Sequence, residues 1–256
     1  MAATTENDLV PALEFVEATL GSVQNSNNVV LENIQWIARQ KEYWVIIGFQ
    51  GTGKSDLLAA AAGLMKPLSG TVRVLGRELA AGFEQDLLAL RLQVALVFDG
   101  GRLLQGLTVA ENIALPLRYH ESSEERIAGR IEELLAFCEL QPFAHSVPGN
   151  LRRAWQQRVA LARALAMQPD ILLLDSPLRG LDRREAVWWL DIMECLWKGH
   201  EIVSGKPLTI IATGDDLQPW RERAQKFGII QNRTLSVLGE QKDLASHARA
   251  LLQEWL

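Results

Sequence analysis

The stretch Gly48 to Ser55, GFQGTGKS, constrains the fold of this chain more than any other feature of the sequence. It matches the pattern G-x-x-x-x-G-K-[ST] over its full length. Before it comes EYWVIIGF (Glu42 to Phe49), a short apolar run of the kind found in buried parallel strands. After it comes KSDLLAAAAGLM (Lys54 to Met65), which has the composition of a helix. A glycine-rich turn between a buried strand and a helix predicts a phosphate-binding loop.

The chemistry of this loop follows from its residue types. Glycines let the backbone wrap a phosphate and turn successive N–H groups toward it, and the helix start adds a favourable partial charge. Lys54 would reach the outer phosphates of a nucleotide, and the Ser55 hydroxyl would bind Mg²⁺. Asp56 brings a like charge beside a triphosphate, so we expect it to reduce ATP affinity without abolishing it. The predicted nucleotide-binding residues are Gly48, Phe49, Gln50, Gly51, Thr52, Gly53, Lys54, Ser55 and Asp56.

The rest of the chain alternates between strand-like and helix-like segments, which predicts an α/β fold with a mainly parallel sheet covered by helices. An antiparallel β part is expected near the N-terminus, and a block of helices is expected to interrupt the alternation. We predict one domain over residues 1–256, with the P-loop core in 9–98 and 168–240, an inserted helical subdomain in 99–167 and a C-terminal helix in 241–256. Predicted strands cover residues 12–20, 29–38, 70–79, 92–98, 171–175 and 208–213 and a hairpin in 227–239, and predicted helices include 122–140 and 183–199.

Composition narrows the functional classes. The net charge is −5 and the pI about 5.5, so the chain has no overall basic footprint for nucleic acid. Its two cysteines, Cys138 and Cys195, have no metal-site spacing and indicate small core residues in a reducing compartment. No signal peptide is visible at the N-terminus, and the longest apolar runs reach about half a membrane span. We expect a soluble, cytoplasmic protein that meets a membrane only through a partner.

A second region carries a resemblance to a known family. The stretch QQRVALARAL (Gln156 to Leu165) is followed by PDILLLD (Pro169 to Asp175), and TIIATGDDL comes later. With the P-loop, this order resembles the nucleotide-binding subunit of an ABC transporter over nearly the whole chain. The resemblance implies an ATP and Mg²⁺ site, with Ser55, Asp175 and Asp99 at the metal. It also implies a dimer, homomeric or heteromeric, that docks on a membrane permease at the inner face of the cell membrane.

At the family's reactive positions the chain departs from the pattern. Ser176 stands where the family has its catalytic glutamate, and Gly214 stands where it has a histidine that touches the γ-phosphate. Asp99 replaces the glutamine that senses γ-phosphate and metal, and as a shorter arm it could still bind Mg²⁺. A neutral hydroxyl cannot take a proton at neutral pH, and loss of such a base typically costs about 10²–10⁴ in rate. We therefore expect Ser176 and Gly214 to be inactive and hydrolysis to be impaired.

The signature that clamps the γ-phosphate of the opposite subunit is also altered. Its serine and two glycines are missing from the matching stretch, Leu151, Arg152, Arg153, Ala154 and Trp155. The two arginines indicate either a solvated helix start or new donors to a phosphate across an interface. The family's subunit-contact loop is matched by Leu181 and Asp182, although Asp182 is equally well explained as a helix cap.

These observations lead to the hypothesis of an ABC ATP-binding subunit that uses ATP mainly to hold a dimer together. The stretch from Leu103 to His120 matches the groove that receives a short permease helix, and it resembles the ATPases of Mla/MCE-type lipid transporters. The main alternative is a P-loop adaptor that regulates another complex without transport. A P-loop kinase or a nucleic-acid-stimulated ATPase fits less well, because QQRVALARAL argues against the first and the acidic balance against the second.

Overall fold

The computed structural model describes residues 10–78 and 85–244. Its larger sheet has six strands in the order β10-β9-β3-β8-β7-β6, and all neighbours are parallel except the β9–β10 hairpin. The three central strands β3, β8 and β7 are buried throughout, as expected for strands covered on both faces. The strands are β3 (Tyr43–Gly48), β6 (Val94–Val97), β7 (Ile171–Leu174), β8 (Thr209–Gly214), β9 (Lys226–Gln231) and β10 (Thr234–Glu240).

The second sheet is antiparallel, with the order β2-β1-β4-β5. Its strands are β1 (Leu13–Gly21), β2 (Val29–Ala38), β4 (Ser69–Val74) and the short β5 (Arg77–Glu78). Leu13 and Phe15 of β1 point into a core that also contains Trp44 and Ile46 of β3, so the two sheets share one apolar interior. The predicted α/β fold with an antiparallel β part near the N-terminus is therefore confirmed.

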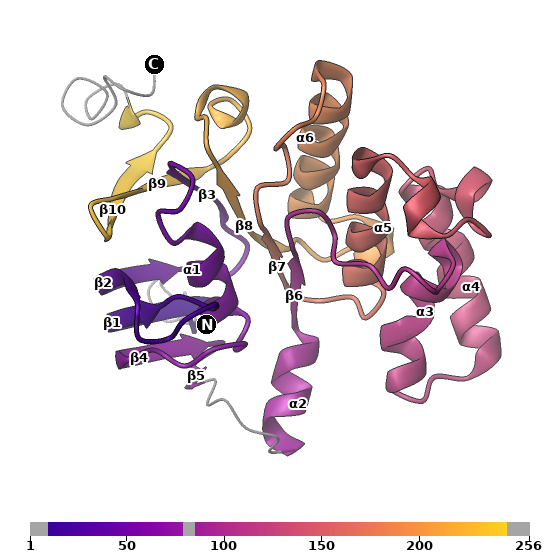
Figure 1. The fold of residues 1–256 in the computed structure, drawn as a ribbon, viewed down its shortest axis with the longest axis horizontal. Helices are drawn as coiled ribbons and strands as arrows, with labels where there is room; N and C mark the ends of the chain where they lie inside the picture. Colours follow the sequence, from indigo (N-terminus) through magenta and orange to yellow (C-terminus); the bar gives the residue numbers. More distant parts are fainter. Residues whose placement is uncertain (1–9, 79–84, 245–256) are drawn as a thin grey trace, which may run out of the picture.

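Helix α1 (Lys54–Ala61) lies between the two sheets (Figure 1). Leu57 and Leu58 bury its apolar side in the shared core. The sequence predicts a helix as far as Met65, but α1 ends four residues earlier. The reason is local: Gly63 adopts a positive φ of 69°, which a right-handed helix cannot contain.

Three helices form a separate group on the side of β6 that faces away from the antiparallel sheet (Figure 1). They are α3 (Val109–Tyr119), α4 (Glu124–Phe137) and α5 (Arg153–Leu165). Thr108 and Glu111 form a capping box at the start of α3, and Ser123 caps α4. Ile113, Leu134 and Leu161 join the helices through one apolar cluster that continues under the large sheet.

Two further helices flank the sheet. Helix α6 (Arg183–Lys198) matches the predicted amphipathic helix and buries Trp189 and Met193 against the large sheet. Helix α2 (Gln85–Leu92) lies before β6 and is absent from the sequence-based assignment. Of the predicted C-terminal helix, residues 245–256 lie outside the described residues. In the ranges that the structure covers, no helix is long and apolar enough to cross a membrane.

Candidate nucleotide-binding site

The fold gathers the predicted site residues at one edge of the large sheet. Strands β3, β8 and β7 are parallel neighbours, so their carboxyl ends lie side by side. These ends carry the P-loop after Gly48, Gly214 at the end of β8 and Asp175 just after β7. Crevices at the carboxyl ends of parallel strands are the usual ligand sites of such sheets.

The P-loop has the backbone that its sequence predicts. Gly51 and Gly53 adopt positive φ values of 83° and 97°, a region that favours glycine. Gly53 is the N-cap of α1, so the loop delivers the helix start directly to the site. The Thr52 hydroxyl donates to the carbonyl of Phe49 at 2.8 Å and fixes the turn. The loop thus has the geometry of a phosphate cradle.

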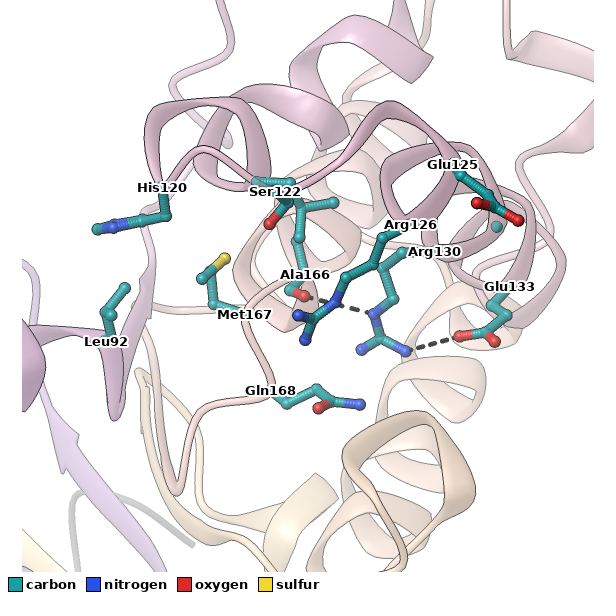
Figure 2. A pocket seen from close by; sticks show the side chains of 12 residues that line it. Leu92, His120, Ser122, Glu125, Arg126, Arg130, Glu133, Ala166, Met167 and Gln168 are labelled. Carbon is teal, nitrogen blue, oxygen red and sulfur yellow. Dashed lines mark hydrogen bonds and ion pairs between the residues drawn. The ribbon is translucent and has the colours of Figure 1, made fainter.

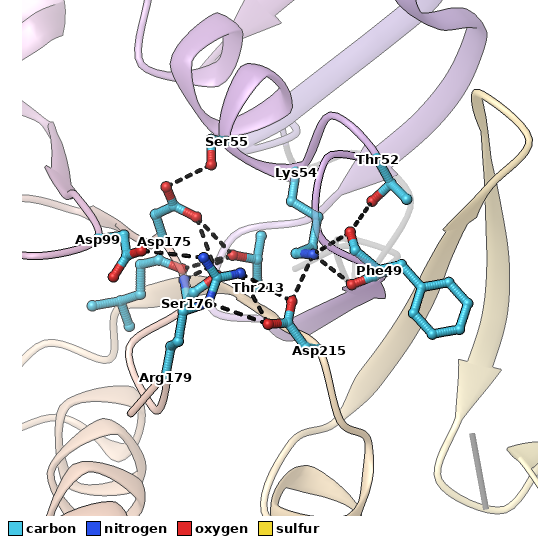
Figure 3. A network of polar contacts seen from close by, with 12 residues as sticks. Phe49, Thr52, Lys54, Ser55, Asp99, Asp175, Ser176, Arg179, Thr213 and Asp215 are labelled. Carbon is cyan, nitrogen blue, oxygen red and sulfur yellow. Dashed lines mark hydrogen bonds and ion pairs between the residues drawn. The ribbon is translucent and has the colours of Figure 1, made fainter. Parts of the chain in front are cut away.

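Lys54 points its ammonium group into this loop. Its side chain is only 4% exposed, and Nζ donates to the carbonyl of Gly48 and, at 2.9 Å, to that of Phe49. The third partner is Asp215, whose Oδ1 lies 2.8 Å from Nζ (Figure 3). A buried cation with one anionic partner that is itself accessible to solvent is suited to receive a phosphate.

Ser55 and Asp175 form the pair expected of a magnesium site. The Ser55 hydroxyl donates to Oδ2 of Asp175 at 2.7 Å, and the Thr213 hydroxyl donates to Oδ1 at 3.2 Å. A carboxylate and a hydroxyl next to a phosphate-binding loop are the oxygen ligands that Mg²⁺ takes in such sites. The residues present therefore fit Mg²⁺ together with a nucleotide phosphate.

Asp99, the third predicted metal residue, lies in two ion pairs, and its contact with Mg²⁺ stays a prediction. One is with Arg153 at the start of α5, and the other is with Arg179, whose Nη1 lies 3.2 Å from Oδ2. The carboxylate thus links the end of the β6 region to the helical group and to the loop after β7.

Ser176 and Gly214 stand at the two positions where the family pattern has reactive side chains, and both line the same cavity. Ser176 is buried, its N–H donates to the Thr213 hydroxyl at 2.9 Å, and its own hydroxyl lies 3.4 Å from Asp175 Oδ1. A Cβ on Gly214 would lie 2.9 Å from Nε1 of Trp220, so the buried indole occupies the space beside this glycine. Neither position offers a group that titrates near neutral pH.

Two residues of this polar network that the sequence analysis does not single out are Arg179 and Asp215. Arg179 forms a fork on Asp215, with Nη2 2.9 Å from Oδ2 and 3.1 Å from Oδ1 (Figure 3). Burial acts to raise the pKa of Asp215, but hydrogen bonds and charges from Lys54 and Arg179 outweigh it, so this pKa lies below its ordinary value. The position of Asp215 could have indicated its place at the site, because it directly follows the predicted site residue Gly214 in TIIATGDDL.

The altered signature has its own set of contacts. Leu151 and Ala154 are buried, and Trp155 packs against Phe143 with ring centroids 4.8 Å apart. Both arginines are exposed at the start of α5, but Arg153 pairs with Asp99, whereas Arg152 has no ion pair among the described residues. The two arginines therefore differ in their ion pairing, which their adjacent positions in the sequence do not reveal.

Asp56 and Asp182 both have local partners. Oδ1 of Asp56 accepts the Val23 N–H at 2.7 Å and ties the β1–β2 loop to α1. Asp182 forms a capping box with Glu185 at the start of α6, and the half-buried Leu181 packs against the core. The capping function of Asp182 is thus confirmed, and its contact with a second subunit stays a prediction.

The fold and this site define the chain as a P-loop nucleotide-binding protein. The sequence model described as ABC transporter matches residues 31–179, which is more than half of the chain. The chain therefore belongs to the ABC transporter family, whose cassettes bind ATP.

The relatives and the solved structure to which the chain is similar are ATP-binding proteins by name. The chain is 32% identical over 238 residues to a probable sulfate/thiosulfate import ATP-binding protein of Chlorella vulgaris, covering 92% of the chain and 93% of that protein. It is 31% identical over 215 residues to a methionine import ATP-binding protein of Clostridium tetani, covering 84% of the chain but only 66% of the relative's length. Among solved structures, a dimeric ATP-binding cassette bound to ADP and Pi superposes with a TM-score of 0.77 at 27% identity, covering 88% and 96% of the two chains.

Proposed function

We propose that this chain is the ATP-binding subunit of an ABC transporter and that it holds Mg·ATP in the P-loop while it is docked, on the cytoplasmic side, to a membrane permease. The observation that carries the proposal is the buried ammonium of Lys54 inside an ordered phosphate loop, beside the Ser55–Asp175 pair. Lys54 would bind the outer phosphates, and Ser55 and Asp175 would hold the metal. When it is bound, Mg²⁺ supplies charge neutralisation for the phosphates.

Hydrolysis on this P-loop should be slow. Ser176 cannot act as a base at neutral pH, and Gly214 has no side chain to contact a phosphate. ATP would then act mainly as a ligand that changes how the chain associates with its partners. The solved dimeric cassette that is bound to ADP and Pi supports a nucleotide-bound dimer. A homodimer and a heterodimer with an intact cassette are both compatible with the chain.

A groove beside α3 supports docking of a permease segment. Two hollows adjoin at Leu92 and Met167, one of about 610 Å³ and one of about 260 Å³. The smaller runs along β6 to Pro116 of α3, and the larger lies between the start of α4 and the end of α5 (Figure 2). Arg130 is fixed there by the carbonyls of Leu165 and Ile202, so this wall is rigid. The groove adjoins the segment from Leu103 to His120, where the sequence predicts the permease contact.

The transported substrate stays a prediction. The Leu103 to His120 stretch predicts lipid transport, whereas the relatives named above are methionine and sulfate/thiosulfate import proteins. The adaptor alternative predicts nucleotide binding without any permease. Copurification with a permease encoded beside this chain would favour transport, and a stable complex with a non-membrane protein alone would favour the adaptor.

The test combines a binding isotherm for Mg·ATP with a phosphate-release assay on the purified full chain. We expect saturable binding, near-background turnover, and loss of binding by at least about tenfold in Lys54→Ala, because the buried ammonium contacts the phosphates. Lys198→Ala is the matched control, since that lysine is exposed on α6 and pairs with Glu194 one helical turn before it. Brisk turnover that Lys54→Ala removes would overturn slow hydrolysis, and unchanged ATP affinity in Lys54→Ala would overturn the site itself.

A further inference from the structure

One carboxylate stands between two cations at the end of β8. Asp215 accepts from Lys54 at 2.8 Å on one side and from the Arg179 fork at 2.9–3.2 Å on the other (Figure 3). It is 42% exposed, so a ligand from solvent can reach it. Arg179 extends the chain of charges to Asp99, which also holds Arg153. Of these residues, Lys54, Asp99 and Arg153 stand at positions that the family pattern assigns to phosphate, whereas Asp215 and Arg179 do not.

The position of Asp215 conflicts with a bound nucleotide. The lysine of a P-loop binds the β- and γ-phosphates, so a phosphate there needs the face of Lys54 that Asp215 now occupies. A carboxylate and a phosphate at the same ammonium repel each other, because both are anionic. Arg179 has the opposite property, since a planar guanidinium binds phosphate oxygens as readily as a carboxylate.

We propose that Asp215 occupies the place of the terminal phosphate between Lys54 and Arg179 in the nucleotide-free chain, and that Arg179 passes from Asp215 to this phosphate when ATP binds. Arg179 then supplies within the subunit a phosphate contact that Gly214 cannot make. The inference rests on the proposed nucleotide binding and goes beyond it, because it assigns a binding residue and an internal competitor.

The surroundings of Asp215 leave space for its side chain to move away from Lys54. A cavity of about 170 Å³ lies beside the carboxylate and is lined by Ser176, Arg179, Gly214, Asp215 and Trp220, among others. Ser176 and Gly214, which stand in place of glutamate and histidine, both line it, and the Trp220 indole closes the side of Gly214. A displaced Asp215 side chain can therefore turn aside without moving a strand.

The experiment measures dissociation constants of Mg·ATP and Mg·ADP for the full chain by displacement of a fluorescent nucleotide. Asp215→Asn should tighten Mg·ATP about fivefold, since an exposed ion pair is worth up to about 1 kcal/mol, which is about fivefold in affinity. It should change Mg·ADP by less than about twofold, because ADP does not need the place that Asp215 occupies. In the Asp215→Asn background, Arg179→Gln should weaken ATP about tenfold and leave ADP within about twofold, because only ATP carries the terminal phosphate. Asp191→Asn is the control, since Asp191 forms a comparable carboxylate–arginine pair with Arg223 on the outside of α6.

The outcomes separate this inference from the proposed function. If ATP binding is lost in Lys54→Ala but is unchanged in Asp215→Asn and in the double variant, the nucleotide site is supported. The proposed exchange of Asp215 for the terminal phosphate is then overturned. No binding by wild type or by Asp215→Asn would overturn both. Binding by Asp215→Asn alone would support the competitor directly. Thermal unfolding checks that the variants are folded, and Asp215→Ser serves as a second variant if Asp215→Asn is not.

Discussion

At the residue scale, the replaced reactive positions are integrated into the packing around them. The backbone N–H of Ser176 is bonded to Thr213, and the space beside Gly214 is filled by the Trp220 indole. Both neighbours are buried. Restoring the larger family residue at either position would therefore create a steric conflict with the present packing, in addition to changing the charge.

Gly214→Ala should lower the free energy of unfolding by about 1–3 kcal/mol, because the added Cβ would lie 2.9 Å from Trp220 Nε1 and the buried indole must shift. Urea unfolding measures this change. Gly129→Ala on α4 is the matched control, since its added Cβ would meet no other part of the described chain within 4 Å and alanine favours a helix. If both variants were as stable as wild type, the indole would not restrict this position. The same contact means that Gly214→His requires Trp220 to move before it can contact a phosphate.

At the element scale, one ion pair joins the start of β3 to β9. The Glu42 carboxylate accepts from Lys226 and, at 2.7 Å, from the Trp44 indole, and it is largely buried. Burial acts to raise its pKa, but the hydrogen bonds from Lys226, Trp44 and the Arg39 N–H outweigh it, so the pKa of Glu42 lies below its ordinary value. A carboxyl whose pKa is lower in the folded state stabilises the fold above its unfolded pKa and loses this contribution as pH falls.

Glu42→Gln should therefore lower the free energy of unfolding at pH 7 by about 2–4 kcal/mol, because Lys226 is left without its partner. The difference from wild type should be constant above about pH 5 and shrink below about pH 4.3, where the carboxyl of an unfolded chain takes up its proton. Urea unfolding at several pH values measures it. Glu124→Gln is the control, because that side chain is 80% exposed. A difference that did not change with pH would contradict the ionic origin.

Elements with strong local patterns were predictable from the sequence, and contacts between distant residues were not. The buried strands β3, β7 and β8 and the helix α6 follow from apolar runs and periodicity. Helix α2 is short, with weak amphipathic character, and was missed. The P-loop, Ser55 and Asp175 follow from a motif. The link from Lys54 through Asp215 to Arg179 could not be predicted, because no local pattern shows which strand ends become neighbours.

At the scale of the whole molecule, the two signature arginines differ in a way that bears on assembly. Arg153 pairs with Asp99 within its own chain, whereas Arg152, which is exposed as Arg153 is, has no ion pair in the part of the chain that the structure describes. In the proposed dimer this segment faces the phosphates in the opposite P-loop. An arginine that is already paired must break that pair to bind a phosphate, and an unpaired one need not. Arg152 is therefore the better candidate for a contact across the interface.

We expect Arg152→Ala to raise the dissociation constant of the Mg·ATP-dependent dimer about tenfold, because a hydrogen bond to a charged group contributes about 1.5–3 kcal/mol. Arg153→Ala is the matched variant one residue away and should change it less than about threefold. Sedimentation velocity over a range of chain concentrations measures both, and the effect of Arg152→Ala should diminish at high salt because exposed charges are screened. If the chain associates only with a second cassette, the same two variants are compared in that pair. Equal effects of the two substitutions, or a larger effect of Arg153→Ala, would contradict the assignment and point to the Asp99 pair as the element that the interface needs.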